Sequence, residues 1–83
     1  MKYTYPAIFE KDGDAYGLWF PDLEHGVSKG NNYEDAVEMA QELLGLILDD
    51  YQQDNIQLPE PGSVKVTLEP GQSIVNITVE RER

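Results

Sequence analysis

The strongest hydrophobic pattern in the chain lies between Tyr33 and Asp54, where apolar residues recur three or four positions apart. The residues of this stripe are Ala36, Val37, Ala40, Leu43, Leu44, Ile47, Leu48 and Tyr51. The spacing predicts an amphipathic helix with Asn31 or Asn32 as its N-cap and with acidic side chains on its polar face. Gly45 lowers the stability of such a helix by about 1 kcal/mol relative to alanine, and we interpret it as a point of close approach to a sheet.

Residues 2–10 and 14–20 alternate in polarity on either side of Lys11-Asp12-Gly13-Asp14, and Asp-Gly is a strong signal for a two-residue type I′ turn. This pattern predicts a β-hairpin in which Lys11 faces Asp14. The resulting apolar pairs are Phe9 with Tyr16, Ala7 with Leu18 and Tyr5 with Phe20. We interpret the face that carries these side chains as the core face of a sheet.

Further segments complete the pattern. Turn residues on both sides of 27–29 indicate a short third strand. After the helix, Leu58-Pro59-Glu60-Pro61-Gly62 forms a stiff connector, and polarity alternates again in 64–68 and 74–80, on either side of a turn at Glu69-Pro70-Gly71-Gln72. The order predicts a single α+β domain, residues 1–83, in which one main helix covers one face of an antiparallel sheet in the order β-β-β-α-β.

The 83 residues include no cysteine and carry a formal net charge of −10. A chain of this size buries one modest core, and without cysteine it has neither disulfides nor thiolate metal ligands. No apolar run approaches the ~20 residues of a membrane span and no leader pattern is present, so we expect a cytoplasmic protein without a membrane partner. The negative charge repels phosphate backbones, so we expect no direct nucleic-acid binding. It would attract a basic partner, but charge alone is explained equally well as a means of keeping a small protein soluble.

The second face of the predicted hairpin is more apolar than a solvated surface. It carries Pro6, Ile8 and Glu10 from the first strand and Trp19 from the second. Aromatic residues anchor many protein interfaces, so this face is a candidate docking surface for another protein or for a second copy of the chain. The alternative is that residues 64–68 or the proline-rich connector fold over it.

Acidic residues gather in two places outside the predicted core. The helix face with Glu38 and Glu42 is either simply solvated or steers a basic partner. The second group surrounds the hairpin turn and the loop after it: Glu10, Asp12, Asp14, Asp22 and Glu24. A ribonuclease-H-type enzyme would need such carboxylates to hold Mg²⁺, but Asp12 and Asp14 suit the turn itself. We therefore predict no catalytic residue, no metal and no cofactor, and we interpret the single histidine, His25, as a passive loop residue.

Several of these segments, taken in order, resemble the HicB-like antitoxins of bacterial and phage toxin–antitoxin systems. The similar core reads "YPAIFEKDGDAYGLWFPDLEHGVSKGNNYEDAVEMAQELL", and "LPEPGSV" and "SIVNITVERE" follow it. The resemblance extends from Met1 to about Glu80, with Glu24-His25-Gly26-Val27 in place of the family's usual Pro-Gly-Cys segment. It implies a partial ribonuclease-H-like fold of the HicB type that is used for binding. The family's carboxy-terminal DNA-binding module has no counterpart before Arg83, so the resemblance implies either a short member of the family or a trimmed core.

By this resemblance the chain is the antitoxin of a type II system, and its partner is a small basic toxin of the HicA family that cleaves messenger RNA. The antitoxin would neutralise the toxin by covering its active surface. The residues assigned to partner binding are Pro6, Ile8, Glu10, Trp19, Asp22, Glu24, Glu38 and Glu42. We also expect a homo-oligomer, either a dimer or a tetramer. The alternative function is a non-enzymatic regulatory or scaffolding domain of the same fold that associates with itself.

Overall fold

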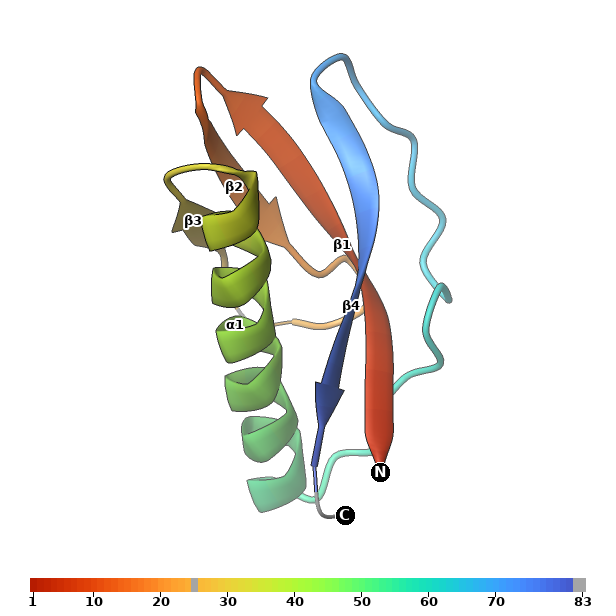
Figure 1. Ribbon diagram of the computed structural model, residues 1–83. Coiled ribbons are helices and arrows are strands. Elements are labelled where there is room, and N and C mark those ends of the chain that lie inside the picture. The colour runs from red at the N-terminus through yellow and green to blue at the C-terminus, as the bar shows by residue number, and fades with distance from the viewer. Residues whose placement is uncertain (25, 82–83) are drawn as a thin grey trace.

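The computed structural model describes residues 1–24 and 26–81, so the interpretation of His25 lies outside the described residues. The elements follow in the order β1 (Lys2–Asp12), β2 (Ala15–Trp19), β3 (Ser28–Gly30), α1 (Tyr33–Gln53) and β4 (Gln72–Glu80). The four strands form one antiparallel sheet in the spatial order β3-β2-β1-β4, and α1 covers one of its faces (Figure 1). This architecture confirms the predicted α+β class and element order.

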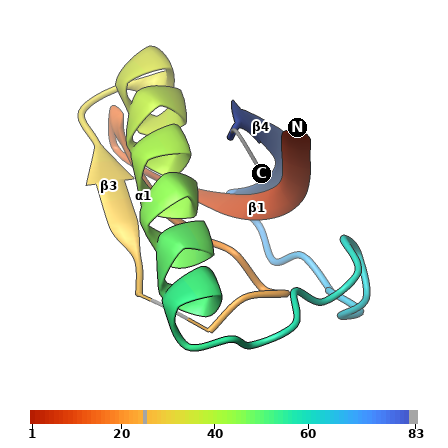
Figure 2. The ribbon, with the colours of Figure 1, turned by 90° about the horizontal axis from the view of Figure 1, so that it is seen from below.

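The first and last described residues extend the β1–β4 ladder. The N–H of Arg81 donates to the carbonyl of Met1 at 2.8 Å, and the amino group of Met1 donates to the carbonyl of Arg81 at 2.7 Å. β1 is strongly curved, so that α1 and β3 lie on one side of it while the segment that connects α1 to β4 returns past the other side (Figure 2). Met1 and Arg81 therefore lie beside each other at the end of the domain opposite the hairpin turn.

The hairpin register differs from the prediction by two residues. The observed pairs are Ile8 with Trp19, Phe9 with Leu18, Glu10 with Gly17, Lys11 with Tyr16 and Asp12 with Ala15. The turn therefore consists of Gly13 and Asp14. Gly13 has a φ of 64° while Asp14 has no positive φ, as in a type II′ turn and not the predicted type I′ turn. A shift of two residues leaves each side chain on its predicted face, because side chains alternate across a strand with a period of two.

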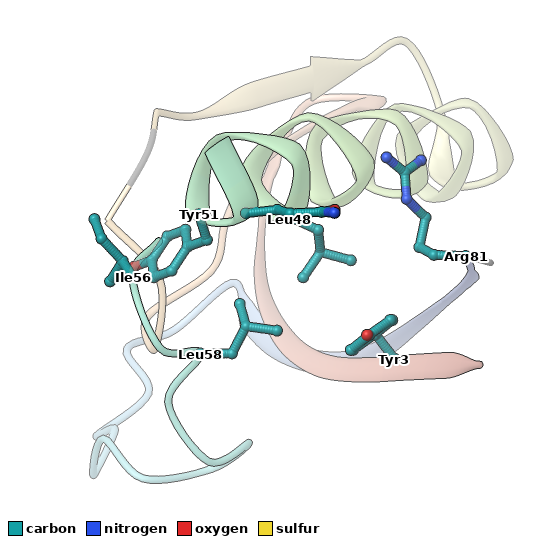
Figure 3. A pocket seen from close by; sticks show the side chains of 7 residues that line it. Tyr3, Leu48, Tyr51, Ile56, Leu58 and Arg81 are labelled. Carbon is teal, nitrogen blue, oxygen red and sulfur yellow. The ribbon is translucent and has the colours of Figure 1, made fainter. Parts of the chain in front are cut away.

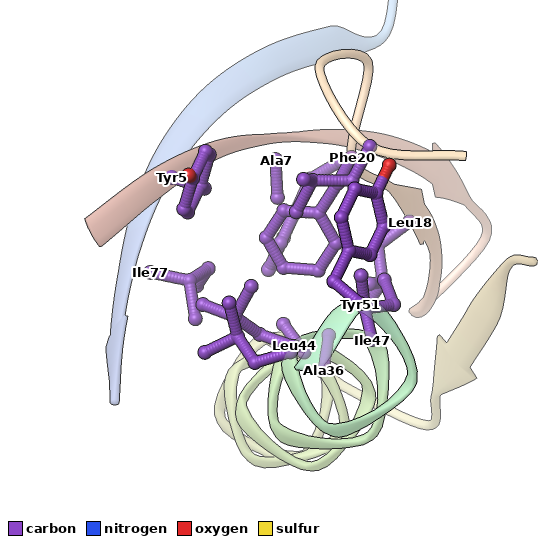
Figure 4. Close-up of a cluster of buried hydrophobic side chains, with 13 residues drawn as sticks. Tyr5, Ala7, Leu18, Phe20, Ala36, Leu44, Ile47, Tyr51 and Ile77 are labelled. Atoms are coloured by element: carbon purple, nitrogen blue, oxygen red, sulfur yellow. The ribbon is translucent and has the colours of Figure 1, made fainter. Parts of the chain in front are cut away.

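The core lies between α1 and the inner face of the sheet (Figure 4). The buried cluster consists of Tyr5, Ala7, Phe9, Leu18, Phe20, Leu23, Ala36, Ala40, Leu44, Ile47, Leu48, Tyr51 and Ile77. All the hairpin side chains assigned to the core face belong to it except Tyr16, whose ring lies at its edge, 6.1 Å from that of Phe9 and 5.7 Å from that of Tyr33. Each large apolar side chain buried here stabilises the fold by roughly 1.5–3 kcal/mol.

α1 begins at one of the two predicted N-caps. Asn32 Oδ1 accepts the N–H of Asp35 at 2.8 Å, and the Asp35 carboxylate accepts the N–H of Asn31 at 2.8 Å. These two bonds satisfy donors that would otherwise be unpaired at the helix start. The helix ends at Gln53, one residue before the predicted end, and its last turn contains no basic residue.

The interpretation of Gly45 as a point of close approach to the sheet is wrong. A Cβ atom at Gly45 would meet only the guanidinium of Arg81, at 3.4 Å. The close approach occurs at Gly30, where a Cβ atom would overlap the backbone N and Cα of Ala36 and would lie 2.8 Å from the carbonyl carbon of Asp35. Gly30 is therefore the residue that lets β3 pass directly beside the start of α1.

The strand predicted at 64–68 is absent, although the polarity of that segment alternates. The turn that follows it is closed by a bond from Gln72 N–H to the Glu69 carbonyl at 3.0 Å, with Gly71 at a φ of 85°. Pro70 followed by a glycine with positive φ is typical of a type II turn, which splays the strands on either side. In addition, the Asp22 carboxylate binds the backbone at the start of the segment. Residues 64–68 are therefore held away from β4.

Pro6 occurs within β1 without disturbing the sheet. Bonded and non-bonded pairs alternate along an antiparallel ladder, and Met1 with Arg81 is a bonded pair. It follows that Pro6 and Asn76 face each other in a non-hydrogen-bonded pair. The missing N–H of Pro6 would point towards β2, whose ladder with β1 has already ended. A proline is therefore tolerated in a central strand at this position.

Candidate functional site

The outer face of the sheet, turned away from α1, carries an apolar row across three strands. Trp19 of β2 pairs with Ile8 of β1, which in turn pairs with Ile74 of β4. Ile74 is 50% exposed and Trp19 is partly exposed, whereas Ile8 between them is only 5% exposed and lies outside the main core cluster. Ile8 therefore forms the buried centre of this outer-face row, between two more exposed side chains. The surface open to a partner belongs to Trp19 and Ile74, with partly exposed Pro6 beside them.

A hollow of about 230 Å³ lies next to this row, towards the hairpin turn. The residues that line it are Glu10, Lys11, Asp12, Gly17, Trp19 and Lys29. Gly17 pairs with Glu10 on one side and with Lys29 on the other, and because it has no side chain it leaves a gap between them. The Glu10 carboxylate accepts a hydrogen bond from the side-chain amide of Gln72 at 2.8 Å. The outer face thus combines aromatic, acidic and basic groups around a depression.

Asp22 does not belong to this surface. Its side chain is 8% exposed, and its carboxylate oxygens accept the backbone N–H groups of Gly62 at 2.7 Å and Val64 at 2.9 Å. Hydrogen bonds to an ionised carboxylate are stronger than those between neutral groups. Asp22 therefore fixes the connector that follows α1, a structural role that the residue pattern alone does not reveal.

The remaining acidic candidates also lie apart from the outer face. Glu24 is exposed in the loop after β2, and its N–H donates to the hydroxyl of Tyr51 at 3.2 Å. Glu38 and Glu42 are exposed on α1, which covers the opposite face of the sheet (Figure 1). The structure therefore brings the candidates from β1 and β2 together and separates them from the acidic residues of the loop and the helix.

Ile74 is the outer-face residue that the assignment from sequence misses. It lies one position out of step with the inward-facing side chains of β4: Val75, Ile77 and Val79. Because successive side chains point to opposite faces, this offset is a signal that could have placed Ile74 beside Ile8 and Trp19.

An apolar pocket of about 280 Å³ lies at the opposite end of the domain, between the C-terminal half of α1 and the start of β1 (Figure 3). The side chains that line it are Tyr3, Leu48, Tyr51, Gln52, Ile56, Leu58 and Arg81. Arg81 forms an ion pair with Asp49 of α1, which ties the end of β4 to the helix. Among the described residues, no carboxylate lines this pocket.

Two properties of the described residues bear on function. Within residues 1–24 and 26–81, no three histidine, aspartate or glutamate side chains are grouped so that they could hold a metal ion. In the same part of the chain, no helix combines the length and the apolar character of a membrane span.

Tyr5 links the core to the connector that follows α1, and its contribution to stability depends on pH. Its hydroxyl donates to the carbonyl of Pro59 at 2.6 Å. Burial raises the pKa of the Tyr5 phenol above its ordinary value of 10.0, and the carboxylates of Asp22 and Glu60 raise that pKa further. The unfolded chain therefore ionises at lower pH than the folded one, so this stabilisation is complete below the unfolded pKa and is lost as the pH rises towards the folded pKa.

We expect the urea midpoint of the wild-type protein to fall between neutral pH and about pH 10.5, and that of Tyr5→Phe to fall less over the same range. At neutral pH the variant is expected to be less stable by about 1 kcal/mol, because it lacks the bond to Pro59. Equal pH dependence in the two proteins would contradict this role of Tyr5.

A family model described as "HicB_like antitoxin of bacterial toxin-antitoxin system" matches residues 4–81. Two curated relatives from Photorhabdus laumondii subsp. laumondii, Antitoxin HicB 2 and Antitoxin HicB 1, are each 34% identical to the chain, over 59 and 61 residues. The matches cover 71% and 72% of this chain but 42% and 39% of the relatives, so the chain spans about two fifths of their length.

A solved toxin–antitoxin complex from Streptococcus pneumoniae contains a chain with the same fold. The TM-score is 0.78 at 25% sequence identity, and the match covers 96% of this chain and 70% of that chain. The fold is therefore that of a domain found in a toxin–antitoxin complex. The chain belongs to the HicB-like antitoxin family, which confirms the resemblance found in the sequence.

Proposed function

We propose that this protein binds a HicA-family toxin that cleaves messenger RNA and neutralises it by covering its active surface, with no enzymatic chemistry of its own. Membership of the HicB-like family supports the antitoxin role, and the matching complex from Streptococcus pneumoniae supports a toxin as partner. The observation that carries the proposal is the outer-face row, in which Trp19 and Ile74 remain accessible. The proposed site of action is the cytoplasm, where messenger RNA is translated.

The outer-face row has the composition of an interface core. Trp19 offers a rigid aromatic surface, and aromatic residues supply much of the binding energy of protein interfaces. Ile74 adds an exposed aliphatic side chain, and the nearly buried Ile8 lies between Trp19 and Ile74 in the row. Pro6 and Glu10 extend the proposed contact along β1. A partner that covers this row would bury apolar surface that is now partly in contact with water.

Charge favours a basic partner. The chain carries a formal net charge of −10, and a field of this sign speeds the encounter with a positively charged protein. We assign Glu24, Glu38 and Glu42 to this steering role, because they are exposed but lie away from the outer face. Asp22 acts indirectly in this proposal, through the connector that its carboxylate holds.

The proposal predicts that Trp19→Ala weakens toxin binding. Because Trp19 is the only aromatic residue in the outer-face row, we expect the dissociation constant for the toxin encoded beside this protein to rise about 30-fold or more. Calorimetry with the purified toxin measures the constant, and growth of cells that express both proteins measures neutralisation.

The matched control is Ile56→Ala, which removes an apolar side chain that is 52% exposed at the opposite end of the domain. It is expected to change the dissociation constant less than about threefold. Equal effects of the two variants would move the interface away from the outer face. If the wild-type chain neither relieves growth arrest nor co-purifies with the toxin, the antitoxin proposal fails as a whole.

The same exposed row also supports the alternative, in which the domain associates with itself as a dimer or tetramer and acts as a regulatory or scaffolding module. Apolar residues such as Ile74 are suited to either kind of contact. Sedimentation of the chain with and without the toxin separates the two functions. Oligomers that dissociate in Trp19→Ala and never bind toxin would favour self-association alone, whereas toxin binding by the chain, as a monomer or an oligomer, would favour neutralisation.

A further inference from the structure

Within residues 1–24 and 26–81, β4 is an outermost strand of the sheet, and one of its edges has no strand beside it. Because Asn76 and Pro6 form a non-hydrogen-bonded pair, the N–H and C=O groups of Asn76 point away from β1, and the alternation turns those of Ile74 the same way. Among the described residues, no backbone hydrogen bond engages these groups. At the next outward position, the side-chain amide of Gln41 approaches the carbonyl of Thr78 at 3.5 Å.

This outer edge of β4 lacks the usual protection of an edge strand. Natural proteins interrupt exposed edges with lysine, proline or bulges, or keep them short. β4 extends over nine residues, Gln72–Glu80, and Glu80 is the only charged residue in it. The segment 64–68 would cover the edge if it formed the other arm of a hairpin, but the turn at 69–72 and the Asp22 carboxylate hold it away. The edge is therefore a free template for another strand.

The surroundings of the edge indicate what kind of strand fits. A groove of about 310 Å³ lies between α1 and the C-terminal half of β4. The helix side of this groove is apolar at Leu46, which is 63% exposed, and at Gly45, which has no side chain to fill the space. The Glu42 carboxylate lines the same groove. An incoming strand with an apolar and a basic side chain would match Leu46 and Glu42, respectively.

We propose that the outer edge of β4 receives a β-strand from a basic partner protein, through backbone hydrogen bonds to Ile74 and Asn76. This inference rests on the proposed function and specifies how the toxin docks. Ile74 belongs to both surfaces, because its backbone lies at the edge and its side chain lies in the outer-face row. One partner can therefore pair with β4 and cover Trp19 at the same time.

Charge argues against a second copy as the occupant. A second copy would bring together two bodies that each carry a formal charge of −10, with the Glu42 carboxylate beside each edge, while Asp49 in the same groove is paired with Arg81. A basic protein meets attraction from the same groups.

The test removes one outward N–H group. Asn76→Pro deletes a donor that makes no hydrogen bond within the chain and places a ring in the path of an incoming strand, so the sheet itself is expected to remain intact. Asn76→Ala is the matched control, because it removes the side chain and keeps the N–H. With the purified toxin encoded beside this protein, we expect Asn76→Pro to weaken binding about tenfold or more and Asn76→Ala to weaken it less than about threefold.

Hydrogen exchange of the wild-type protein gives a second measurement that needs no variant. In the complex, the amides of Ile74 and Asn76 are expected to exchange at least about tenfold more slowly than in the free chain. Unchanged exchange in a complex that does form would overturn strand addition, as would protection that rises with protein concentration in the absence of toxin. Failure of the wild-type chain to bind the toxin at all would instead overturn the proposed function, so the two failures are distinguishable.

Discussion

Replacement of Gly30 by alanine is expected to destabilise the domain by about 3 kcal/mol or more. The added Cβ atom would overlap the backbone of Ala36 and approach that of Asp35, and backbone atoms cannot rotate aside as a flexible side chain can. Either β3 or the first turn of α1 must move, which would also disturb the Asn32 cap. For a domain of this size, such a loss lowers the melting temperature by roughly 12 °C or more, which scanning calorimetry measures directly.

Gly45→Ala is the matched control for this prediction. Its Cβ atom would meet only the mobile end of the Arg81 side chain, and alanine is the better helix former. We expect this variant to gain about 0.5–1 kcal/mol. A melting temperature of Gly30→Ala within a few degrees of the wild type would contradict the close packing of β3 against α1.

Asp22→Asn is expected to destabilise the protein by about 2–3 kcal/mol. The substitution preserves the size of the side chain, but the amide offers one acceptor oxygen where the carboxylate offers two, so it cannot bind both Gly62 and Val64. Urea denaturation measures the loss. Hydrogen exchange is expected to accelerate at those two amides before the rest of the domain opens.

The control for this variant is Asp12→Asn, because Asp12 lies exposed next to the hairpin turn and its replacement is expected to stay within about 0.5 kcal/mol of the wild type. The same pair tests the magnesium-nuclease hypothesis. If Asp22 were a metal ligand, Asp22→Asn would abolish a Mg²⁺-dependent cleavage of RNA–DNA hybrids without a large loss of stability. A result of that kind would contradict both the structural role of Asp22 and the non-enzymatic function.

The main elements can be predicted from periodicity because each pattern matches the environment of its element. The stripe of α1 and the alternation in β1 and β2 each face one buried surface, so both elements and their core faces follow from the sequence. The register of the hairpin and the absent strand at 64–68 do not follow. The register depends on which residues occupy the turn. The absence of the strand depends on hydrogen bonds from Gly62 and Val64 to the carboxylate of Asp22, which lies 40 and 42 positions earlier in the chain.

In the candidate site, too, the face on which a residue lies can be predicted from the sequence, but its exposure cannot. Alternation alone places Pro6, Glu10 and Trp19 on one face, and in the structure Glu10 and Trp19 line the same hollow while Pro6 lies farther along β1. Whether such a residue is accessible depends on its neighbours, so the burial of Ile8 could not be predicted from its position in β1. For the same reason, the residue pattern does not reveal that Asp22 is enclosed by a connector that lies far away along the chain.

The pairing of Met1 with Arg81 has a practical consequence for the study of this protein. Because these residues lie side by side at the end of the domain opposite the hairpin turn, a tag or fluorophore attached at either position leaves the molecule at nearly the same point. Labels at both positions would stay close in the folded protein and separate when it unfolds. Immobilisation through that end would present the turn, and the hollow over Gly17 near it, to the solution.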